Sequence, residues 1–473
     1  MDRTTFLQRC VRRSSRAERM RLAELAGQRV AIWGCGREGR AVLSALHTRV
    51  PSLRPTVFCA IGELADVAAA ASGAEVIASA PGVADLSAFD VVIKSPGISA
   101  YRPELLEARR NGTRFTSATA LWFAESPHSR VIAVTGTKGK STTTALIAHL
   151  LRARGRYVAL AGNIGMPLIE LLDPPREPDW WVVELSSFQT REAAQVDVAV
   201  ITNLEEEHLD WHGDRSRYVD DKLALAGVAR VLVVNAGAVD LLARTQAHPH
   251  RERFGDRAGF HVGASALMRG EDAVFDRALL PLPGRHNALN ACAALAALEA
   301  AGEDAAAAAP HLASFRPLPH RLQHLGMRDG LAWIDDSIAT TPQASLEALA
   351  SVDAERTWLL VGGHDRGLDW RAFAEAVSRQ PPRAIIANGA SARRIAAVLG
   401  EVGGAYGLHV VATLADAVAL ARAGAVEGDT LLLSPGAPSF DQFRDYAERG
   451  SAFAAMAGFD ASSIGAIGGL GIA

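Results

Sequence analysis

The chain has 473 residues, 49% of them hydrophobic, and is long enough to bury about three separate cores. Its 49 Lys and Arg residues stand against 52 Asp and Glu residues, and the net charge of −3 excludes a global basic field for nucleic acid or an anionic membrane. No stretch reaches the roughly 18 apolar residues of a membrane span, and the Arg-rich start lacks the apolar segment of a secretory signal. We expect a cytoplasmic monomer that acts on small molecules, with no nucleic-acid partner and no membrane insertion.

The N-terminal segment and the cysteines carry no predicted chemistry. We predict that residues 1–27 form a solvated helical extension. Cys10, Cys35, Cys59 and Cys292 are scattered without a CxxC pair, which argues against a zinc or disulfide framework and favours a reducing compartment. We expect these thiols to be packing residues.

A strand, a GxGxxG turn and a helix follow at residues 28–33, 34–39 and 40–47, as in nucleotide-binding half-sheets. An NAD site needs an acid at the end of the next strand, but the predicted strand 55–60 ends without one. The turn therefore either binds another diphosphate or only packs strand on helix. A second turn, after the strand that begins at residue 91, could close over the same diphosphate. The candidate residues are Gly34, Gly36, Arg37, Glu38, Ser95, Pro96 and Gly97.

The strongest local motif is a phosphate-binding loop between an apolar strand, 131–135, and a helix. Glycines let backbone N–H groups approach phosphate oxygens, Lys140 can reach the terminal phosphates, and Ser141 can bind Mg²⁺. The spacing departs from GxxxxGK[ST], because Val134 occupies the position six before Lys140. The alternative is an ordinary glycine-rich turn with a chance Lys-Ser pair. The candidate ATP-binding residues are Gly136, Thr137, Lys138, Gly139, Lys140, Ser141 and Thr142.

Further apolar strands alternate with helices after this loop, which predicts a largely parallel sheet. Glu184 ends one strand and could be a second Mg²⁺ ligand beside Ser141, or else a helix-start carboxylate. His208 follows another strand among acids and is a ligand candidate. Lys222, taken alone, would be a solvated helix lysine. From about Pro317, four more strands separated by helix-length segments predict a doubly wound α/β domain.

Taken together, these motifs resemble those of the Mur ligases, the ATP-dependent amide-forming enzymes of peptidoglycan synthesis. The resemblance runs nearly end to end, and its motifs follow the family's order. They are GTKGKST (136–142), GNIG (162–165), ELSSFQ (184–189), NLEEEHLD (203–210), GRHNALN (284–290), PLPHR (317–321), DDSIATT (335–341) and SPGAPSFDQF (434–443).

The resemblance implies three tandem α/β domains: a Rossmann-like domain that binds UDP (1–117), a P-loop ATPase domain with a mostly parallel sheet (118–316), and a doubly wound domain that binds the amino acid (317–473). It also implies ligation of glutamate to UDP-N-acetylmuramoyl-L-alanine through an acyl-phosphate. The γ-phosphoryl charge that develops in that step requires Lys140 and metal ions.

Site residues follow from the same resemblance. Mg²⁺ would be held by Ser141 and Glu184, and a second ion near His208. The family carbamylates the lysine at the position of Lys222, which requires a neutral amine and hence a pKa well below about 10.4. ATP would contact Asn287, Asn290, His320, Arg321 and Asp336. The muramoyl substrate and glutamate would contact Asn163, Ser187, Gln189, Thr340, Arg366, Ser439, Phe440 and Tyr446.

Two departures from the family pattern concern the substrates. The second strand lacks the acidic and threonine residues that typically hold uridine, and Ile338 replaces a lysine in DDSIATT. The amino-acid motifs look like the branch that adds L-glutamate and leaves inversion to an epimerase, so we favour L-glutamate, with D-glutamate as the alternative. Further alternatives are a folylpolyglutamate-synthase-like ligase, which normally lacks the first domain, and a non-catalytic nucleotide sensor. Intact Lys140, Glu184, His208 and Lys222 weigh against a sensor.

Overall fold

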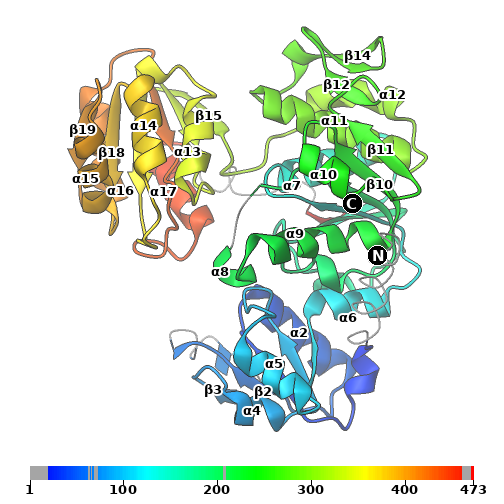
Figure 1. Ribbon diagram of the computed structural model, residues 1–473. Coiled ribbons are helices and arrows are strands. Elements are labelled where there is room, and N and C mark those ends of the chain that lie inside the picture. The colour runs from blue at the N-terminus through cyan, green and yellow to red at the C-terminus, as the bar shows by residue number, and fades with distance from the viewer. Residues whose placement is uncertain (1–19, 62–63, 65–66, 69–72, 206–208, 461–469) are drawn as a thin grey trace. The chain divides into compact units, whose positions relative to one another are not determined.

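The computed structural model describes residues 20–61, 64, 67–68, 73–205, 209–460 and 470–473 (Figure 1). Its strands form three sheets of five, ten and six strands. The chain divides into two compact units, one that ends at Phe315 and includes the last residues of the chain, and one that begins at Arg316. The first unit contains the five- and ten-stranded sheets. The mixed α/β fold with mostly parallel sheets is confirmed.

The first sheet is parallel throughout and has the strand order β3-β2-β1-β4-β5. Its central strands read VAIW and VVIK and are buried along their whole length, as apolar strands covered on both faces are. The predicted helix after the glycine turn begins at Arg37, because Gly36 is its N-cap. The elements are β1 (Val30–Trp33), α2 (Arg37–Arg49), β2 (Thr56–Phe58), β3 (Glu75–Ile77), α4 (Val83–Ser87), β4 (Val91–Lys94), α5 (Pro103–Arg110) and β5 (Arg114–Thr116).

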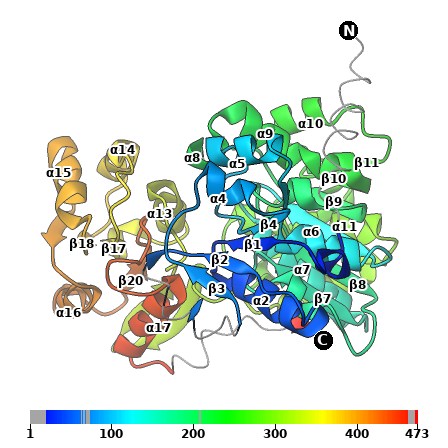
Figure 2. The ribbon, with the colours of Figure 1, turned by 90° about the horizontal axis from the view of Figure 1, so that it is seen from below.

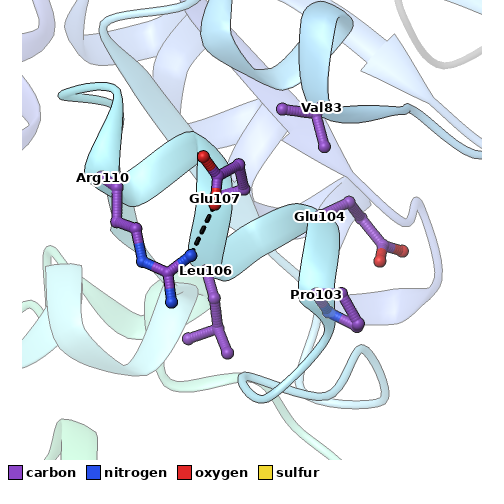
Figure 3. Close-up of a pocket in the computed structure, with 6 residues that line it drawn as sticks. All are labelled: Val83, Pro103, Glu104, Leu106, Glu107 and Arg110. Carbon is purple, nitrogen blue, oxygen red and sulfur yellow. Dashed lines mark hydrogen bonds and ion pairs between the residues drawn. The ribbon is translucent and has the colours of Figure 1, made fainter.

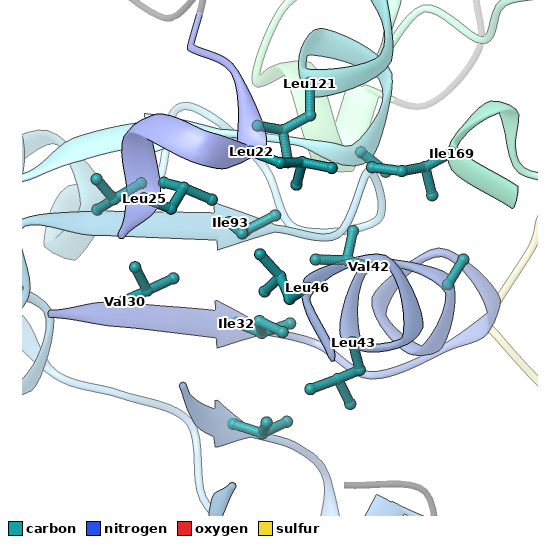
Figure 4. Close-up of a cluster of buried hydrophobic side chains, with 14 of the residues drawn as sticks. Leu22, Leu25, Val30, Ile32, Val42, Leu43, Leu46, Ile93, Leu121 and Ile169 are labelled. Carbon is teal, nitrogen blue, oxygen red and sulfur yellow. The ribbon is translucent and has the colours of Figure 1, made fainter. Parts of the chain in front are cut away.

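The end of the N-terminal segment corrects one prediction. Residues 1–19 lie outside the described part, but Leu22–Leu25 form a short 3₁₀ helix, η1, rather than a solvated extension. Leu22 and Leu25 are buried and pack with Val42, Leu46 and their neighbours in the core of the first sheet (Figure 4). The burial of these two apolar side chains holds the segment against the first sheet, although arginines surround them in the sequence.

The ten-stranded sheet follows the order β14-β13-β12-β11-β10-β9-β6-β8-β7-β21 and is parallel except at its two ends. The largely parallel sheet is confirmed, whereas β11 to β14 were not predicted. Helices α7 and α11 pack against each other beside it. The elements are α6 (Ala118–Glu125), β6 (Val131–Thr135), α7 (Lys140–Ala153), β7 (Val158–Gly162), η3 (Leu168–Leu171), β8 (Trp180–Glu184), η4 (Thr190–Glu192), β9 (Val196–Ile201), α8 (Leu209–His212), α9 (Arg215–Ala224), η5 (Ala226–Val228), β10 (Ala229–Asn235), α10 (Val239–Arg244), β11 (Arg251–Phe254), β12 (Phe260–Val262), β13 (Ala266–Arg269), β14 (Asp272–Asp276), η6 (Arg277–Leu279), α11 (Arg285–Ala300), α12 (Ala305–Ala308) and η7 (Ala309–Ser314).

The last residues of the chain do not lie in the third domain, which the sequence predicts at 317–473. Strand β21 (Gly471–Ile472) pairs antiparallel with β7 in the ten-stranded sheet, and Val158 and Ala473 exchange two backbone hydrogen bonds. Arg152 fixes this end further by donating from Nη2 to Gly471 O at 3.1 Å. The last residues therefore belong to the first unit. The other domain boundaries stay predictions.

The third sheet has the order β15-β16-β20-β17-β18-β19 and is parallel from β16 to β19. Helices α13, α14 and α15 cover one face and α16 and α17 the other (Figure 2), so the doubly wound architecture is confirmed. The elements are β15 (Gln323–Arg328), β16 (Leu331–Asp335), α13 (Pro342–Leu349), η8 (Ala354–Arg356), β17 (Thr357–Gly362), α14 (Arg371–Arg379), β18 (Ala384–Asn388), α15 (Ala392–Val402), β19 (Gly407–Val410), α16 (Leu414–Gly424), β20 (Thr430–Leu433) and α17 (Tyr446–Met456).

Two other sequence expectations concern the cysteines and membrane spans. Cys35, Cys59 and Cys292 are buried and form no disulfide within the described residues, as expected of packing residues. Cys10 lies outside them. None of the helices in the described ranges is both long and apolar enough to cross a bilayer.

The buried position of η1 predicts a large stability effect. We expect Leu22→Ala to lower the free energy of unfolding by about 2–4 kcal/mol, because it leaves a cavity under the first sheet. Ile61→Ala, at a side chain that is 80% exposed, should change it by less than about 0.5 kcal/mol. Urea unfolding of both variants measures this, and equal effects would contradict the packing of η1.

Candidate active site

The phosphate loop connects β6 to α7, as the sequence predicts, and two residues after β9 hold its backbone. The N–H groups of Thr137 and Lys138 both donate to Asn203 Oδ1 at 2.8 Å. Thr202 Oγ1 donates to the Lys138 carbonyl at 2.6 Å. The loop is thus fixed by the neighbouring parallel strand, and the first turn of α7 supplies the helix-start N–H groups that favour anions.

Two glycines of the loop are required by close contacts. Gly136 has φ 147°, and a Cβ on it would lie 1.9 Å from Thr202 Oγ1. Gly139 has φ 81°, and its Cβ would lie 2.3 Å from Asn290 Oδ1. Any side chain at either position would displace the groups that fix the loop.

Two lysines converge on the same carbonyl. Lys140 Nζ donates to Gly136 O at 3.0 Å and to Thr137 O at 2.8 Å. Lys222 Nζ donates to Gly136 O at 2.6 Å, although the two residues are 86 positions apart in the sequence. Lys222 is only 2% exposed and lies over the ring of Tyr218, so it is not the solvated lysine that its local sequence suggests.

Glu184 lies beside the loop at the carboxyl end of β8, opposite Val134 of β6. It is 1% exposed, and its Oε1 accepts a hydrogen bond from Asn163 Nδ2 at 2.7 Å. Its Oε2 is buried and has no hydrogen-bond partner among the described residues, as is the case for the hydroxyl of Thr135. A buried carboxylate oxygen without a donor is the kind of group that a cation or an ordered water satisfies.

These oxygens fit Mg²⁺ chemically. Mg²⁺ takes oxygen ligands and usually needs one or two carboxylates, with phosphates and waters completing its shell. The buried Glu184 carboxylate and the Ser141 hydroxyl on the first turn of α7 meet that requirement. The described residues contain no group of three or more His, Cys, Asp or Glu side chains that could hold a metal. His208 lies outside the described residues.

Asn287 and Asn290, predicted to contact ATP, both lie near the phosphate loop on α11. Asn290 is the residue that closes on Gly139, and Thr143 donates to its Oδ1 at 3.4 Å. Asn290 Nδ2 in turn donates to Asn287 Oδ1 at 3.3 Å. Both side chains are buried, at 7% and 9% exposed, and connect α11 to the loop.

A buried polar network that the sequence did not reveal lies next to Lys222. His212 is fully buried and bridges Asp221 Oδ2, at 2.6 Å from Nδ1, and Ser187 Oγ, at 3.0 Å from Nε2. Asp221 also pairs with Arg191 and accepts from Tyr101 OH at 2.8 Å. Ser187, expected to bind substrate, therefore has its hydroxyl engaged inside the protein. The network fixes the start of α9's last turn, where Lys222 lies.

Tyr101 and its neighbours attach the first sheet to this network. Trp211 Nε1 donates to Pro96 O at 2.9 Å, so the predicted Ser-Pro-Gly turn packs on α8. Ser99 donates from Oγ to the Trp211 carbonyl, and the rings of Tyr101 and Trp211 meet edge to face. The exposed Arg37 donates to the Gly165 carbonyl in the GNIG segment.

The GxGxxG turn brings strand and helix close together, and the carboxyl group of its acid, Glu38, points into the protein. A Cβ on Gly39 would lie 2.4 Å from Gly34 O, so strand and helix touch here. Glu38 Oε1 accepts from Gln189 Nε2 at 2.8 Å, and Glu38 Oε2 is buried without a partner. Burial, and then repulsion from Glu192, raise the pKa of Glu38 to about 7. The backbone of the turn, rather than this carboxylate, is therefore the part suited to a diphosphate.

Glu38 shares a buried charge cluster with Glu192 and Lys94. Lys94 Nζ lies 3.5 Å from Glu192 Oε1, and both side chains are more than nine-tenths buried. Burial also raises the pKa of Glu192. One cation faces two carboxyl groups, so one of the carboxyls holds a proton more readily than in water.

The first domain has a hollow beside the glycine turn and another on α4 and α5. A small one of about 10 Å³ lies between the glycine turn and Ser95, and is lined by Gly34, Glu38 and Lys94 among others. A larger one, of about 560 Å³, lies on α4 and α5 and is lined by Val83, Pro103, Glu104, Leu106, Glu107 and Arg110 (Figure 3). No predicted site residue lines the larger one.

In the second unit, the residues predicted to contact ATP lie around the end of β16. His320, at φ 59°, is buried and its Nδ1 lies 2.7 Å from Asp335 Oδ2. Asp336 accepts from Ser434 Oγ at 2.7 Å and from the N–H of Leu322 at 3.1 Å. Burial raises the pKa of Asp336 to about 7 against the opposing effect of these bonds and of Arg321.

The predicted amino-acid residues of this unit differ in exposure. Arg366 and Thr340 are exposed, and Phe440 is 59% exposed. Ser439 is buried, and Tyr446 is half-buried with its carbonyl accepting from Ser337 Oγ at 2.7 Å. The roles assigned to these residues stay predictions.

The fold and the loop define an enzyme class. A phosphate loop at the start of α7, a buried acid at the end of β8 and a second lysine on the loop backbone are the parts of a P-loop enzyme that uses a nucleoside triphosphate. Family models match as "Mur ligase middle domain" at residues 134–298 and as "Mur ligase, glutamate ligase domain" at residues 320–436. The chain belongs to the Mur ligase family of ATP-dependent, amide-forming ligases. The predicted resemblance is confirmed.

Several relatives are similar over nearly the full chain. A protein of Xanthomonas euvesicatoria pv. vesicatoria is 52% identical over 468 residues, which cover 96% of this chain and 100% of that protein. One of Xylella fastidiosa is 48% identical over the same shares, and one of Micromonospora sp. is 38% identical over 92% of this chain and 97% of that protein. All three are named UDP-N-acetylmuramoyl-L-alanine–L-glutamate ligase.

Solved structures confirm the fold. UDP-N-acetylmuramate–alanine ligase of Thermotoga maritima matches with a TM-score of 0.57 at 22% identity, over 87% of this chain and 96% of that chain. A MurF ligase of Thermotoga maritima in complex with ADP matches with a TM-score of 0.56 at 16% identity, over 87% and 95%. At these identities the likeness shows the three-domain fold alone.

The buried Glu38 predicts a pH-dependent stability. A folded pKa of about 7 lies above the ordinary 4.5, so the wild type loses stability as the pH rises from about 4.5 to about 7. Glu38→Gln cannot ionise and keeps an acceptor for Gln189. We compare the free energy of unfolding of this variant with that of wild type at each pH. The difference, variant minus wild type, should be larger at pH 8 than at pH 5 by about 1–2 kcal/mol.

Thermal melts at both pH values measure this difference. The control is Glu271→Gln, at an 81% exposed side chain paired with an exposed arginine, and it should show no such pH dependence. If the difference in stability between Glu38→Gln and wild type is the same at pH 5 and pH 8, the carboxyl of Glu38 does not titrate with a raised pKa.

Proposed function

We propose that this protein joins glutamate to UDP-N-acetylmuramoyl-L-alanine in an ATP-dependent step of peptidoglycan precursor synthesis. The observation that carries the proposal is the convergence of Lys140 and Lys222 on the Gly136 carbonyl beside the buried Glu184. Near full-length relatives that carry this activity in their names support it. The N-terminal sheet, present here, argues against a folylpolyglutamate-synthase-like ligase, and the convergent site argues against a non-catalytic sensor.

The chain's own groups suit acyl-phosphate formation. Phosphoryl transfer to the L-alanyl carboxylate places growing negative charge near the loop, where Lys140 and the first-turn amides of α7 can offset it. The amine of glutamate then attacks the activated carbonyl, forms the amide and releases phosphate. Asn287 and Asn290 would hold the nucleotide beside Gly139. His320, Arg321 and Asp336 are proposed to contact ATP on the resemblance alone.

Mg²⁺ fits the oxygens that Ser141 and Glu184 present, and it would supply charge neutralisation for the ATP phosphates. Asn163 donates to Glu184 Oε1, which orients the carboxylate and leaves Oε2 for the ion. His208 is proposed as a ligand of a second ion on the resemblance alone.

The surroundings of Lys222 favour its carbamylation. Two ammonium groups that share one carbonyl, at 3.0 and 2.6 Å, lie within about 6 Å of each other, and Lys222 is 2% exposed. A carbamate on Lys222 would replace one of these two positive charges by a negative one and keep one N–H for Gly136 O.

The remaining assignments concern the substrates and the place of action. We infer that Gly34, Gly36, Ser95 and Gly97 face the UDP group, and that Arg366, Ser439 and Tyr446 face glutamate. The protein would act as a cytoplasmic monomer, since the reaction consumes ATP and a UDP-linked precursor. The L isomer is favoured because Ile338 replaces the lysine of D-specific ligases and because the relatives are named for L-glutamate.

The first test of this function is Lys140→Ala. We expect at least about a hundredfold loss of kcat, because the transferring phosphoryl group loses its fixed counter-charge. Phosphate release with ATP, Mg²⁺, UDP-N-acetylmuramoyl-L-alanine and glutamate measures this, with Arg154→Ala, which removes an exposed cation at the other end of α7, as the control. Turnover near wild type would remove Lys140 from the reaction.

A second test concerns the carbamate. Lys222→Ala should lose most activity, and short-chain carboxylic acids should restore part of it by replacing the carbamate anion. Mass spectrometry of the intact wild type in bicarbonate should show the added carbamate mass, which the variant lacks. Full activity of Lys222→Ala without additives contradicts the idea.

The third test compares the glutamate enantiomers. D- and L-glutamate carry identical groups, so a site separates them only by where those groups meet fixed partners. We expect kcat/KM to be higher for L-glutamate by roughly tenfold or more. A higher value for D-glutamate in parallel assays would reverse this assignment and leave the ligase function intact.

A further inference from the structure

A group of three buried polar atoms in the second unit has no hydrogen-bond partner within the part of the chain that the structure describes. It consists of Ser439 Oγ, Asp441 Oδ1 and Arg449 Nη1. Folded proteins pair nearly all such atoms, with protein groups, water or a ligand. Several unpaired atoms in one cluster therefore indicate a place that is completed by another molecule.

Arg449 connects the elements around this cluster. It lies on α17, is 3% exposed, and donates from Nε to Ser337 Oγ at 3.0 Å and from Nη2 to Ser337 O at 2.7 Å. Its third nitrogen, Nη1, points toward Gly363, where a Cβ would lie 3.0 Å away and 2.3 Å from Pro438 O. Gly363 is a glycine because the guanidinium and this carbonyl occupy the space.

The guanidinium has no ion-pair partner among the residues that the structure describes. Burial lowers the pKa of Arg449 to about 10, while Asp441 and Asp335 oppose the shift from a distance. The side chain thus keeps its charge at neutral pH. A buried cation with an unused N–H is costly unless an anion compensates it.

The cluster lies where this fold binds ligands. Ser337, Gly363 and Ser439 follow the carboxyl ends of β16, β17 and β20, which are adjacent parallel strands. Open α/β sheets bind ligands at that edge. The loop 335–341 itself carries no cationic side chain. The charge reaches this loop from α17 instead.

We propose that Arg449 binds a carboxylate of the amino-acid substrate through Nη1, with the Ser439 hydroxyl as a second donor. The inference rests on the proposed ligase function and deepens it. Asp441 Oδ1, two residues from Ser439, is a buried acceptor with no partner within the described residues, so the group complements an amino acid better than a simple anion.

The test measures steady-state phosphate release by the full-length protein at varied glutamate and at varied ATP. Arg449→Met keeps much of the buried volume and removes the charge, and it should raise the KM for glutamate roughly tenfold to hundredfold. The KM for ATP should stay within about twofold of wild type, because Arg449 is not among the residues predicted to contact ATP. Arg449→Lys keeps the charge, so its KM for glutamate should lie between those of wild type and Arg449→Met.

Controls separate binding from a structural role. Arg444→Gln, at an 86% exposed side chain near the start of the same helix, should leave both KM values unchanged. Melting temperatures of all variants are recorded. An Arg449→Met protein that is less stable but keeps the wild-type KM for glutamate overturns the proposal.

A second variant keeps the proposal testable if Arg449→Met does not fold. If Arg449→Met does not fold, Ser439→Ala, a smaller change in the same cluster, should raise the KM for glutamate, and a wild-type KM overturns the proposal. A wild type that releases no phosphate with glutamate contradicts the ligase function itself. An active wild type with unaffected variants contradicts only the role of Arg449.

Discussion

The carbonyl of Gly136 is the group on which the central site depends. It accepts hydrogen bonds from Lys140, which belongs to the loop, and from Lys222, which belongs to α9. The glycine that carries it cannot hold a side chain, since Thr202 occupies that space. Asn203 fixes the next two N–H groups. The directions of the loop groups are therefore set before a phosphate binds, which is the arrangement that lowers reorganisation during phosphoryl transfer.

The first domain contributes to this preorganisation. Asp221, next to Lys222, is held by Tyr101 from the first domain and by Arg191 and His212 from the second. On the other side of the interface, Glu38 of the glycine turn accepts from Gln189, in the segment that follows Glu184. The segment around Lys222 and the segment that follows Glu184 are therefore each in direct contact with the first domain.

The sequence revealed those elements whose burial shows in the residue types. Strands such as β6, β8 and β17 are continuous apolar runs, and the loop between β6 and α7 has its own spacing. Strands such as β11, with the sequence RERF, and β15, with QHLGMR, are polar and depend on their neighbours, so no local pattern marks them. Lys222 and Arg449 are buried by partners far away in the sequence, and a lone lysine or arginine on a helix has no local sign of that. His212 and Asp221 were missed for the same reason.

Strand β21 decides which sheet a shortened chain would damage. The chain leaves the first unit after Phe315 and builds the third sheet, and its last residues pair with β7 of the ten-stranded sheet. A chain without residues 471–473 would keep every strand of the third sheet but leave the edge of β7 unpaired. Exposed strand edges pair readily with other chains, so the loss of these residues would remove the protection of this edge against edge-to-edge association.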